Sequence, residues 1–150
     1  MQQATNIKKK RVLFICTHNA VRSQIAEGFL RTLYGDRYEV FSAGTEPTRI
    51  NPYTIKVMEE LGIDVSEQRA KPLVRFLGDK FDLVITVCNR ARECCPFFAG
   101  AKMVEHKSFD DPDRFMANEE QILVKFRDLR DQIKNWIEER FGEVAGKPQC

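Results

Sequence analysis

The sequence predicts a single α/β domain built on a four-stranded parallel sheet with helices on both faces. Apolar runs of strand length alternate along the chain with segments whose apolar residues recur at helical spacing. The runs at 11–16 and 81–87 are apolar almost throughout, which is typical of strands covered on both faces. A chain of 150 residues fits one domain, here 1–150 with its ordered core over about 9–142.

Four segments are predicted as strands. The first is the apolar run that ends at Cys16, the second alternates between apolar and polar residues, the third again ends directly before a cysteine, and the fourth is short. They cover residues 11–16, 38–44, 81–87 and 101–105. Because strands that alternate with helices form parallel sheets, the carboxyl ends of all four are expected at one edge, where ligands bind.

The predicted helices lie between and after these strands. The first runs from Arg22 to Tyr34, before Gly35. Asn51 and Pro52 supply an N-cap and a first-turn proline for the next, which Gly62 closes. A short helical segment is predicted over 72–77, and a long final helix over 122–141.

Composition narrows the functional class. A net charge of +2 with 43% apolar and 31% charged residues indicates a globular protein and argues against nucleic acid or membrane as partner. The apolar run behind the basic residues 8–11 is too short for a signal peptide. Five cysteines, an odd number without a secretory signal, favour reduced thiols in the cytoplasm. The spacing of the cysteines does not predict a metal site. We also expect that the protein is a monomer and that it uses no cofactor.

The segment from Cys16 to Ser23 predicts an anion-binding loop. A cysteine at the end of a strand and an Arg-Ser pair at the start of a helix place the thiol at the positive end of a helix dipole. Such a field lowers the pKa of a thiol, and a hydrogen bond from Ser23 lowers it further. Arg22 supplies a planar fork for two oxyanion oxygens. The backbone amides expected to complete the cradle are those of Thr17, His18, Asn19, Ala20 and Val21.

Asp111 is the candidate general acid. It precedes Pro112, which holds it extended after the last predicted strand, at the expected mouth of the cradle. Asp110 is the competing candidate, and a plain turn aspartate is the alternative interpretation. Asn19 tolerates the left-handed conformation that a tight loop needs, and the His18 side chain has no catalytic role in this interpretation.

Cys88 and Cys95 are residues that a simple phosphatase does not need. If residues 89–94 are helical, these cysteines lie about 10 Å apart along the axis. The limit for a disulfide is roughly 7 Å between Cα atoms, so a bond between them requires that segment to rearrange. Cys94 competes with Cys95 as the final thiol, and Cys150 is expected to be a spectator.

With these residues in place, the sequence resembles the thioredoxin-coupled arsenate reductases, which share the fold of the low-molecular-weight protein tyrosine phosphatases. The resemblance extends over about 9–142 and is carried by the segments 12–27, 41–44, 51–52, 84–96 with its Cys-x6-Cys-Pro, and 106–112 ending in Asp-Pro.

The resemblance implies a role for each candidate. Cys16 is the nucleophile toward arsenate or a phosphate-like oxyanion, Arg22 the clamp and Asp111 the acid. Cys88 then attacks the sulfur of the arseno-cysteine adduct, and Cys95 takes over the resulting disulfide for thioredoxin to reduce.

The sequence departs from the family at two places. Ala20 and Val21 stand where the family often has a serine and a small residue or cysteine, so one loop hydroxyl is missing. Some members bind potassium with an asparagine, a glutamate, a serine and an aspartate. Asn19, Glu27 and Ser42 match the first three, but Lys71 aligns with the aspartate, and its ammonium is expected to replace the ion.

Two other functions remain open from the sequence. A tyrosine phosphatase of the same fold needs Cys16, Arg22 and Asp111 but neither Cys88 nor Cys95. A binding protein that senses arsenite or a soft metal would use Cys88, Cys94 and Cys95 without turnover.

Overall fold

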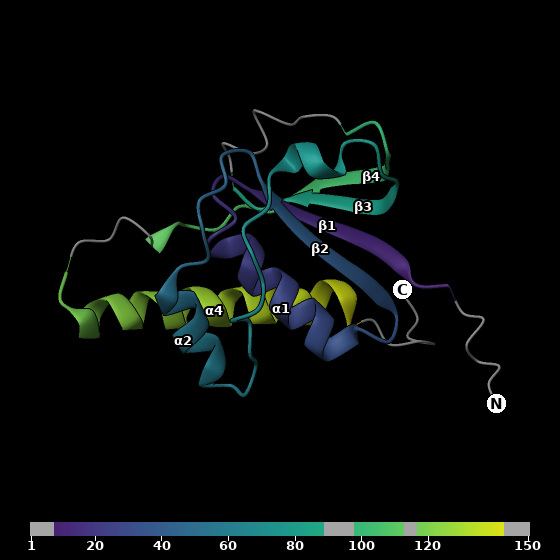
Figure 1. The fold of residues 1–150 in the computed structure, drawn as a ribbon. Helices are drawn as coiled ribbons and strands as arrows, with labels where there is room; N and C mark the ends of the chain where they lie inside the picture. Colours follow the sequence, from purple (N-terminus) through teal and green to yellow (C-terminus); the bar gives the residue numbers. More distant parts are fainter. Residues whose placement is uncertain (1–7, 89–97, 113–116, 143–150) are drawn as a thin grey trace.

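The computed structural model describes residues 8–88, 98–112 and 117–142 of the chain. Its four strands are β1 (Lys10–Cys16), β2 (Tyr38–Gly44), β3 (Phe81–Thr86) and β4 (Ala101–His106). They form one sheet in the order β2-β1-β3-β4, and every neighbouring pair is parallel (Figure 1). The predicted strand positions and the parallel sheet are therefore confirmed.

The helices begin and end close to the predicted positions. They are α1 (Arg22–Tyr34), α2 (Pro52–Glu59), the 3-10 helix η2 (Leu73–Phe76) and α4 (Glu119–Phe141). Asn51 caps α2, since its side chain accepts a hydrogen bond from Tyr53 N (2.7 Å). The final helix begins three residues earlier than its apolar spacing predicts, because Asn118 accepts a hydrogen bond from Gln121 N (2.9 Å) and caps it.

Aromatic contacts show how helices cover the two faces of the sheet. Phe14 of β1 packs edge-on against Trp136 and Phe141 of α4, with ring centroids 6.0 and 6.2 Å apart. α1 lies beside α4 on the same side of the sheet (Figure 1). On the other face, Phe76 of η2 contacts Phe41, with ring centroids 5.8 Å apart. Helical segments thus lie on both faces, and within the described residues the second carries only η2.

Three connections meet at the carboxyl ends of the strands. Val87 N donates a hydrogen bond to Ile15 O (2.8 Å), and Phe109 N donates one to Val87 O (3.3 Å). The segments that follow β3 and β4 therefore stay beside the end of β1, where Cys16 lies. In the described part of the chain, no helix is both long and apolar enough to cross a membrane.

Glu60, the residue after α2, joins that helix to α4. Its carboxylate accepts hydrogen bonds from Arg127 Nη2 (2.8 Å) and from Arg130 Nη1 (2.7 Å). Arg130 is buried and also donates to Val57 O (2.9 Å). The hydrogen bonds from Arg127 outweigh the opposing effect of burial and lower the pKa of Glu60 to about 2. The ionised Glu60 is therefore preferred in the folded state.

We expect Glu60→Gln to lower the free energy of unfolding at neutral pH by on the order of 1 kcal/mol, because the network is half-exposed and screened by solvent. A lowered carboxyl pKa stabilises the fold above the ordinary pKa of 4.5, and that contribution is lost as the pH falls toward about 2. Urea denaturation of both proteins from pH 7 to pH 2.5 should show the difference shrinking below pH 4.5. Glu59→Gln removes a neighbouring carboxylate and serves as the control. If the difference in the free energy of unfolding between Glu60→Gln and the unsubstituted protein were the same at pH 2.5 as at pH 7, this account would be contradicted.

Candidate active site

The loop between β1 and α1 is held in place by its carbonyl groups. Cys16 O, Thr17 O and His18 O accept hydrogen bonds from the backbone amides of residues 45, 46 and 48 (3.1, 2.7 and 3.1 Å). Asn19 O accepts one from the Gln24 side chain (2.9 Å), and Ala20 O accepts from the amide of residue 51 (3.0 Å). Each of these five carbonyls is therefore bound to a group outside residues 16–20.

This arrangement orients the amides of the loop. In a trans peptide the N–H points away from the preceding C=O, so carbonyls held on one side leave the amides of residues 17–21 on the other. One of them, Asn19 N, donates to Cys16 Sγ (3.2 Å). Asn19 has a φ of 53°, in the left-handed region predicted for it. The amide of Asn19 thus points at the thiol, as the amides of an anion cradle do.

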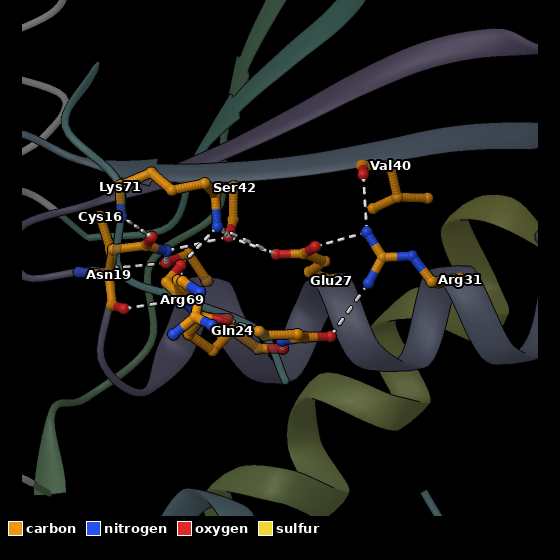
Figure 2. A network of polar contacts seen from close by, with 11 residues as sticks. Cys16, Asn19, Gln24, Glu27, Arg31, Val40, Ser42, Arg69 and Lys71 are labelled. Carbon is orange, nitrogen blue, oxygen red and sulfur yellow. Dashed lines mark hydrogen bonds and ion pairs between the residues drawn. The ribbon is translucent and has the colours of Figure 1, made fainter. Parts of the chain in front are cut away.

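The Asn19 side chain fixes the direction of the hydrogen bond to the thiol. Its Oδ1 accepts from Lys71 N (2.8 Å; Figure 2). Its Nδ2 is therefore the donor to Ser23 Oγ (2.7 Å). Ser23 accepts that bond and keeps its own proton for Cys16 Sγ, 2.8 Å away. Ser23 can therefore donate to the sulfur, which is the direction required when Cys16 is a thiolate.

Arg22 lies at the mouth of the loop with one donor unused. Its Nη1 donates to Phe109 O (3.2 Å) and its Nη2 to Asp111 Oδ2 (3.0 Å). Its Nε is buried and has no hydrogen-bond partner within the described residues. A buried donor left unpaired costs about 1–3 kcal/mol. Because Nε and Nη2 share one edge of the guanidinium, an oxyanion with two available oxygens would satisfy both.

The pocket between the loop and Asp111 is closed in this arrangement. It is lined by residues 16, 18, 20, 21, 22 and 111 and has a volume of about 10 Å³. A cavity of that size holds about one water molecule. A tetrahedral oxyanion therefore enters only after Asp111 has moved away from Arg22.

The pKa of Cys16 is shifted in the opposite direction from the sequence-based expectation. Cys16 is 1% exposed, and its burial raises the pKa of the thiol above the ordinary value. The hydrogen bond from Ser23 and the charge of Arg22 lower it, but they do not outweigh the loss of solvation. The predicted lowering is therefore wrong for the closed pocket.

Cys88 lies beside the same loop. Its Sγ is 3.2 Å from Thr17 Oγ1, and it is buried like Cys16. The two thiols are close enough for a charge on Cys88 to raise the pKa of Cys16. Cys16, Arg22, Cys88 and Asp111 are thus brought together as the sequence predicts, while Cys94, Cys95 and Cys150 lie outside the described residues.

Two contributors to the site were not identified from the sequence. Gln24 is fully buried and anchors both Asn19 O and Arg69 O through its Nε2 (2.9 Å each). A glutamine in the first turn of a helix carries no signal for such a role. Phe109 accepts a hydrogen bond from Arg22 through its backbone carbonyl. Every residue has such a carbonyl, so the sequence does not single out Phe109 for this role. No cluster of three or more potential metal-binding side chains occurs in the part of the chain that the structure describes.

Gly44 approaches the loop too closely for a side chain. A Cβ there would lie 2.7 Å from Thr17 O and 3.0 Å from Asn19 N. We expect Gly44→Ala to displace the loop and to weaken phosphate binding at least about tenfold in calorimetric titration, because the amides act together. Gly78→Ala meets no atom within 4 Å and serves as the control. Equal phosphate affinities for the two variants would show that the loop tolerates the displacement.

Ser23→Ala tests the hydrogen bond to the thiol. Because Ser23 lowers the pKa of Cys16, its loss should raise that pKa further and leave less thiolate at any pH below it. The expected result is a Cys16 alkylation profile shifted to higher pH. The rate is followed on the Cys16 peptide by mass spectrometry with iodoacetamide, and Ser66→Ala, on an exposed turn, is the control. A profile that stays in place would mean that Ser23 does not donate to the sulfur.

Comparison with known proteins assigns this arrangement to a family. Residues 11–148 match the low molecular weight phosphotyrosine protein phosphatase family. The chain is 41% identical over 127 residues to an arsenate reductase of Halalkalibacterium halodurans, which covers 85% of this chain and 91% of the relative.

Solved structures show the same fold. An arsenate reductase in the phosphate binding state superposes with a TM-score of 0.76 at 37% identity, covering 89% of this chain and 97% of the other. A thioredoxin-dependent arsenate reductase of Corynebacterium glutamicum gives 0.60 at 28% identity, covering 90% of this chain and 64% of the other. The chain belongs to the low molecular weight phosphotyrosine protein phosphatase family.

Proposed function

We propose that this protein is an arsenate reductase in which Cys16 attacks arsenate and a disulfide relay through Cys88 and Cys95 carries the electrons. The observation that carries the proposal is the second buried thiol, Cys88, which follows β3 and lies against the loop that begins at Cys16 (Thr17 Oγ1 to Cys88 Sγ, 3.2 Å). Hydrolysis of a phosphate ester has no use for it. Arsenate reductases are among the relatives and solved structures most similar to the chain, which supports the same function.

The first step forms an adduct on Cys16. Arsenate replaces Asp111 as the partner of Arg22 Nη2 and also takes the unpaired Nε, while the loop amides bind its other oxygens. The Cys16 thiolate attacks arsenic, and one arsenate oxygen leaves as water. Asp111, released from Arg22, lies where it can protonate that oxygen.

The second step reduces arsenic. The Cys88 thiolate attacks Cys16 Sγ, the S–As bond breaks, and its electron pair stays on arsenic, which leaves as arsenite. A Cys16–Cys88 disulfide results, so the two sulfurs have supplied the two electrons. Thr17, whose hydroxyl contacts Cys88 Sγ, keeps the second thiol at the loop for this attack.

The third step moves the oxidised pair away from the pocket. Cys95 attacks Cys88 Sγ, Cys16 leaves as a thiolate, and the Cys88–Cys95 disulfide is reduced by a dithiol protein. We assign thioredoxin to this role, supported by a structural neighbour that is thioredoxin-dependent, and place the reaction in a reducing cytoplasm.

Cys88→Ser separates this function from the phosphatase of the same fold. We expect multiple-turnover arsenate reduction to fall at least about 100-fold, because no thiol remains to attack the adduct. Slow hydrolysis of an aryl phosphate, which needs only Cys16, Arg22 and Asp111, should be retained. The measurement is arsenate-dependent NADPH oxidation with thioredoxin and thioredoxin reductase, and Cys150→Ser is the matched control.

Other outcomes favour other functions. Arsenate reduction that survives in Cys88→Ser would contradict the relay, and phosphate ester hydrolysis without any arsenate turnover in the unsubstituted protein would favour a phosphatase. Stoichiometric arsenite binding without turnover would favour a sensor. Activity with glutathione and glutaredoxin in place of thioredoxin would change the reductant. Peptide mapping of the disulfide trapped without reductant distinguishes Cys95 from Cys94.

A further inference from the structure

Lys71 places a partly buried ammonium beside the buried carboxylate of Glu27 behind the loop. Its Nζ donates to Arg69 O (2.5 Å), lies 3.5 Å from Ser42 Oγ, and forms an ion pair with Glu27 Oε1 at 3.8 Å (Figure 2). The side chains of Lys71 and Glu27 are 16% and 6% exposed. Neither residue takes part in the reaction steps proposed above.

The Glu27 carboxylate is the end of a hydrogen-bond chain that starts at Cys16. Asn19 Nδ2 donates to Ser42 Oγ (3.0 Å) as well as to Ser23, so Ser42 has its own proton free, and it donates that proton to Glu27 Oε1. The other carboxylate oxygen, Oε2, accepts from Arg31. An ionised carboxylate is an acceptor only, so Ser42 donates to Glu27 and accepts from Asn19. The second N–H of Asn19 Nδ2 then goes to Ser23, which leaves the Ser23 proton available for the thiolate.

The Lys71 main chain is hydrogen-bonded to the same loop and to the end of β2. Its N–H donates to Asn19 Oδ1 (2.8 Å), and its carbonyl accepts from Gly44 N (2.8 Å). The ammonium is therefore tethered to a fixed backbone position. Burial lowers the pKa of Lys71, and the Glu27 charge opposes that shift by favouring the ammonium form.

These contacts show whether the residues around Lys71 could hold a potassium ion. Some members of the family that the sequence resembles bind one at this place. Asn19, Glu27 and Ser42 are present, but the Lys71 ammonium already lies against the glutamate and the serine. A second cation at this place would be repelled at close range in a poorly solvated site. The site does not fit potassium as long as Lys71 holds its charge.

We propose that Lys71 is a positioning residue: its tethered ammonium is the permanent counter-cation of Glu27 and thereby keeps Ser42 and Asn19 oriented so that Ser23 donates to Cys16. The inference concerns the loop itself and rests on the proposed function only in taking Cys16 as the reacting thiol. Without the ammonium, Glu27 keeps its ion pair with Arg31 on Oε2, but Oε1 and Ser42 Oγ lose their neighbouring cation. That loss leaves a cluster of oxygens that attracts another cation.

A cavity gives a small cation access to this site. A pocket of about 540 Å³ is lined by Glu27, Lys71, Arg31, Gln68 and Arg69 among others. In Lys71→Met the Glu27 carboxylate, the Ser42 hydroxyl and the Arg69 carbonyl remain, which are the hard oxygen ligands that an alkali cation prefers. The variant should therefore bind the ion that the native protein does not need.

The test compares Lys71→Met in potassium chloride and in choline chloride at equal ionic strength. In choline chloride we expect Cys16 alkylation at fixed pH to be about tenfold slower than in the unsubstituted protein, because less of the thiol is ionised. Potassium chloride should restore most of the rate and raise the Tm of the variant. The unsubstituted protein and Lys56→Met, which alters an exposed lysine, should respond equally to both salts.

The double variant Glu27→Gln/Lys71→Met removes both charges and should respond equally to both salts. A potassium response that persists in it would place the ion elsewhere and overturn the proposal. So would native-like alkylation of Lys71→Met in choline, or a slow rate that potassium does not change. If Lys71→Met folds only in potassium, the proposal is supported, and failure in both salts counts against it. Because alkylation and Tm need no arsenate, these outcomes are independent of the proposed reaction.

Discussion

The active loop depends on the hydrogen bonds that hold its carbonyls from outside. The donors come from the segment after β2, from the first residue before α2 and from a side chain in the first turn of α1. Orienting five peptides in one direction is unfavourable for an isolated loop, because their dipoles repel. The sheet and two helices supply the compensating bonds, so the anion cradle is a property of the whole fold. Gly44 allows the close approach that brings these donors to the loop.

The same burial that shapes the pocket determines its electrostatics. Burial removes the Cys16 thiol from water and raises its pKa, and the charge of Arg22, which is also paired with Asp111 at 3.0 Å, does not reverse this shift. An oxyanion that displaces Asp111 brings the guanidinium and the loop amides into use together, in surroundings where charges act strongly. On this view the substrate helps to complete the site that reacts with it.

The sequence predicted what depends on local pattern and on topology. Apolar runs located β1 and β3, capping residues located the start of α2, and the parallel topology brought Cys16 and Cys88 to one edge. The direction of the Cys16 pKa shift was missed, because desolvation depends on packing from every side. Gln24 and the carbonyl of Phe109 were missed because their roles arise only from tertiary contacts. Side-chain identity reveals a nucleophile more readily than the groups that orient it.

A tethered cation behind the loop changes how the site responds to its surroundings. An exchangeable ion stabilises a protein by an amount that grows with its concentration, so the order of such a loop follows the salt composition of its medium. An ammonium attached to the chain has a constant effective concentration beside Glu27. Most of the entropy lost in positioning it is lost on folding, because the Lys71 main chain is hydrogen-bonded through both its N–H and its carbonyl. If a dissolved cation replaced the Lys71 ammonium, the order of the loop would depend on the concentration of that cation. The hydrogen bond from Ser23 to Cys16 is therefore set by the fold alone when Lys71 is present.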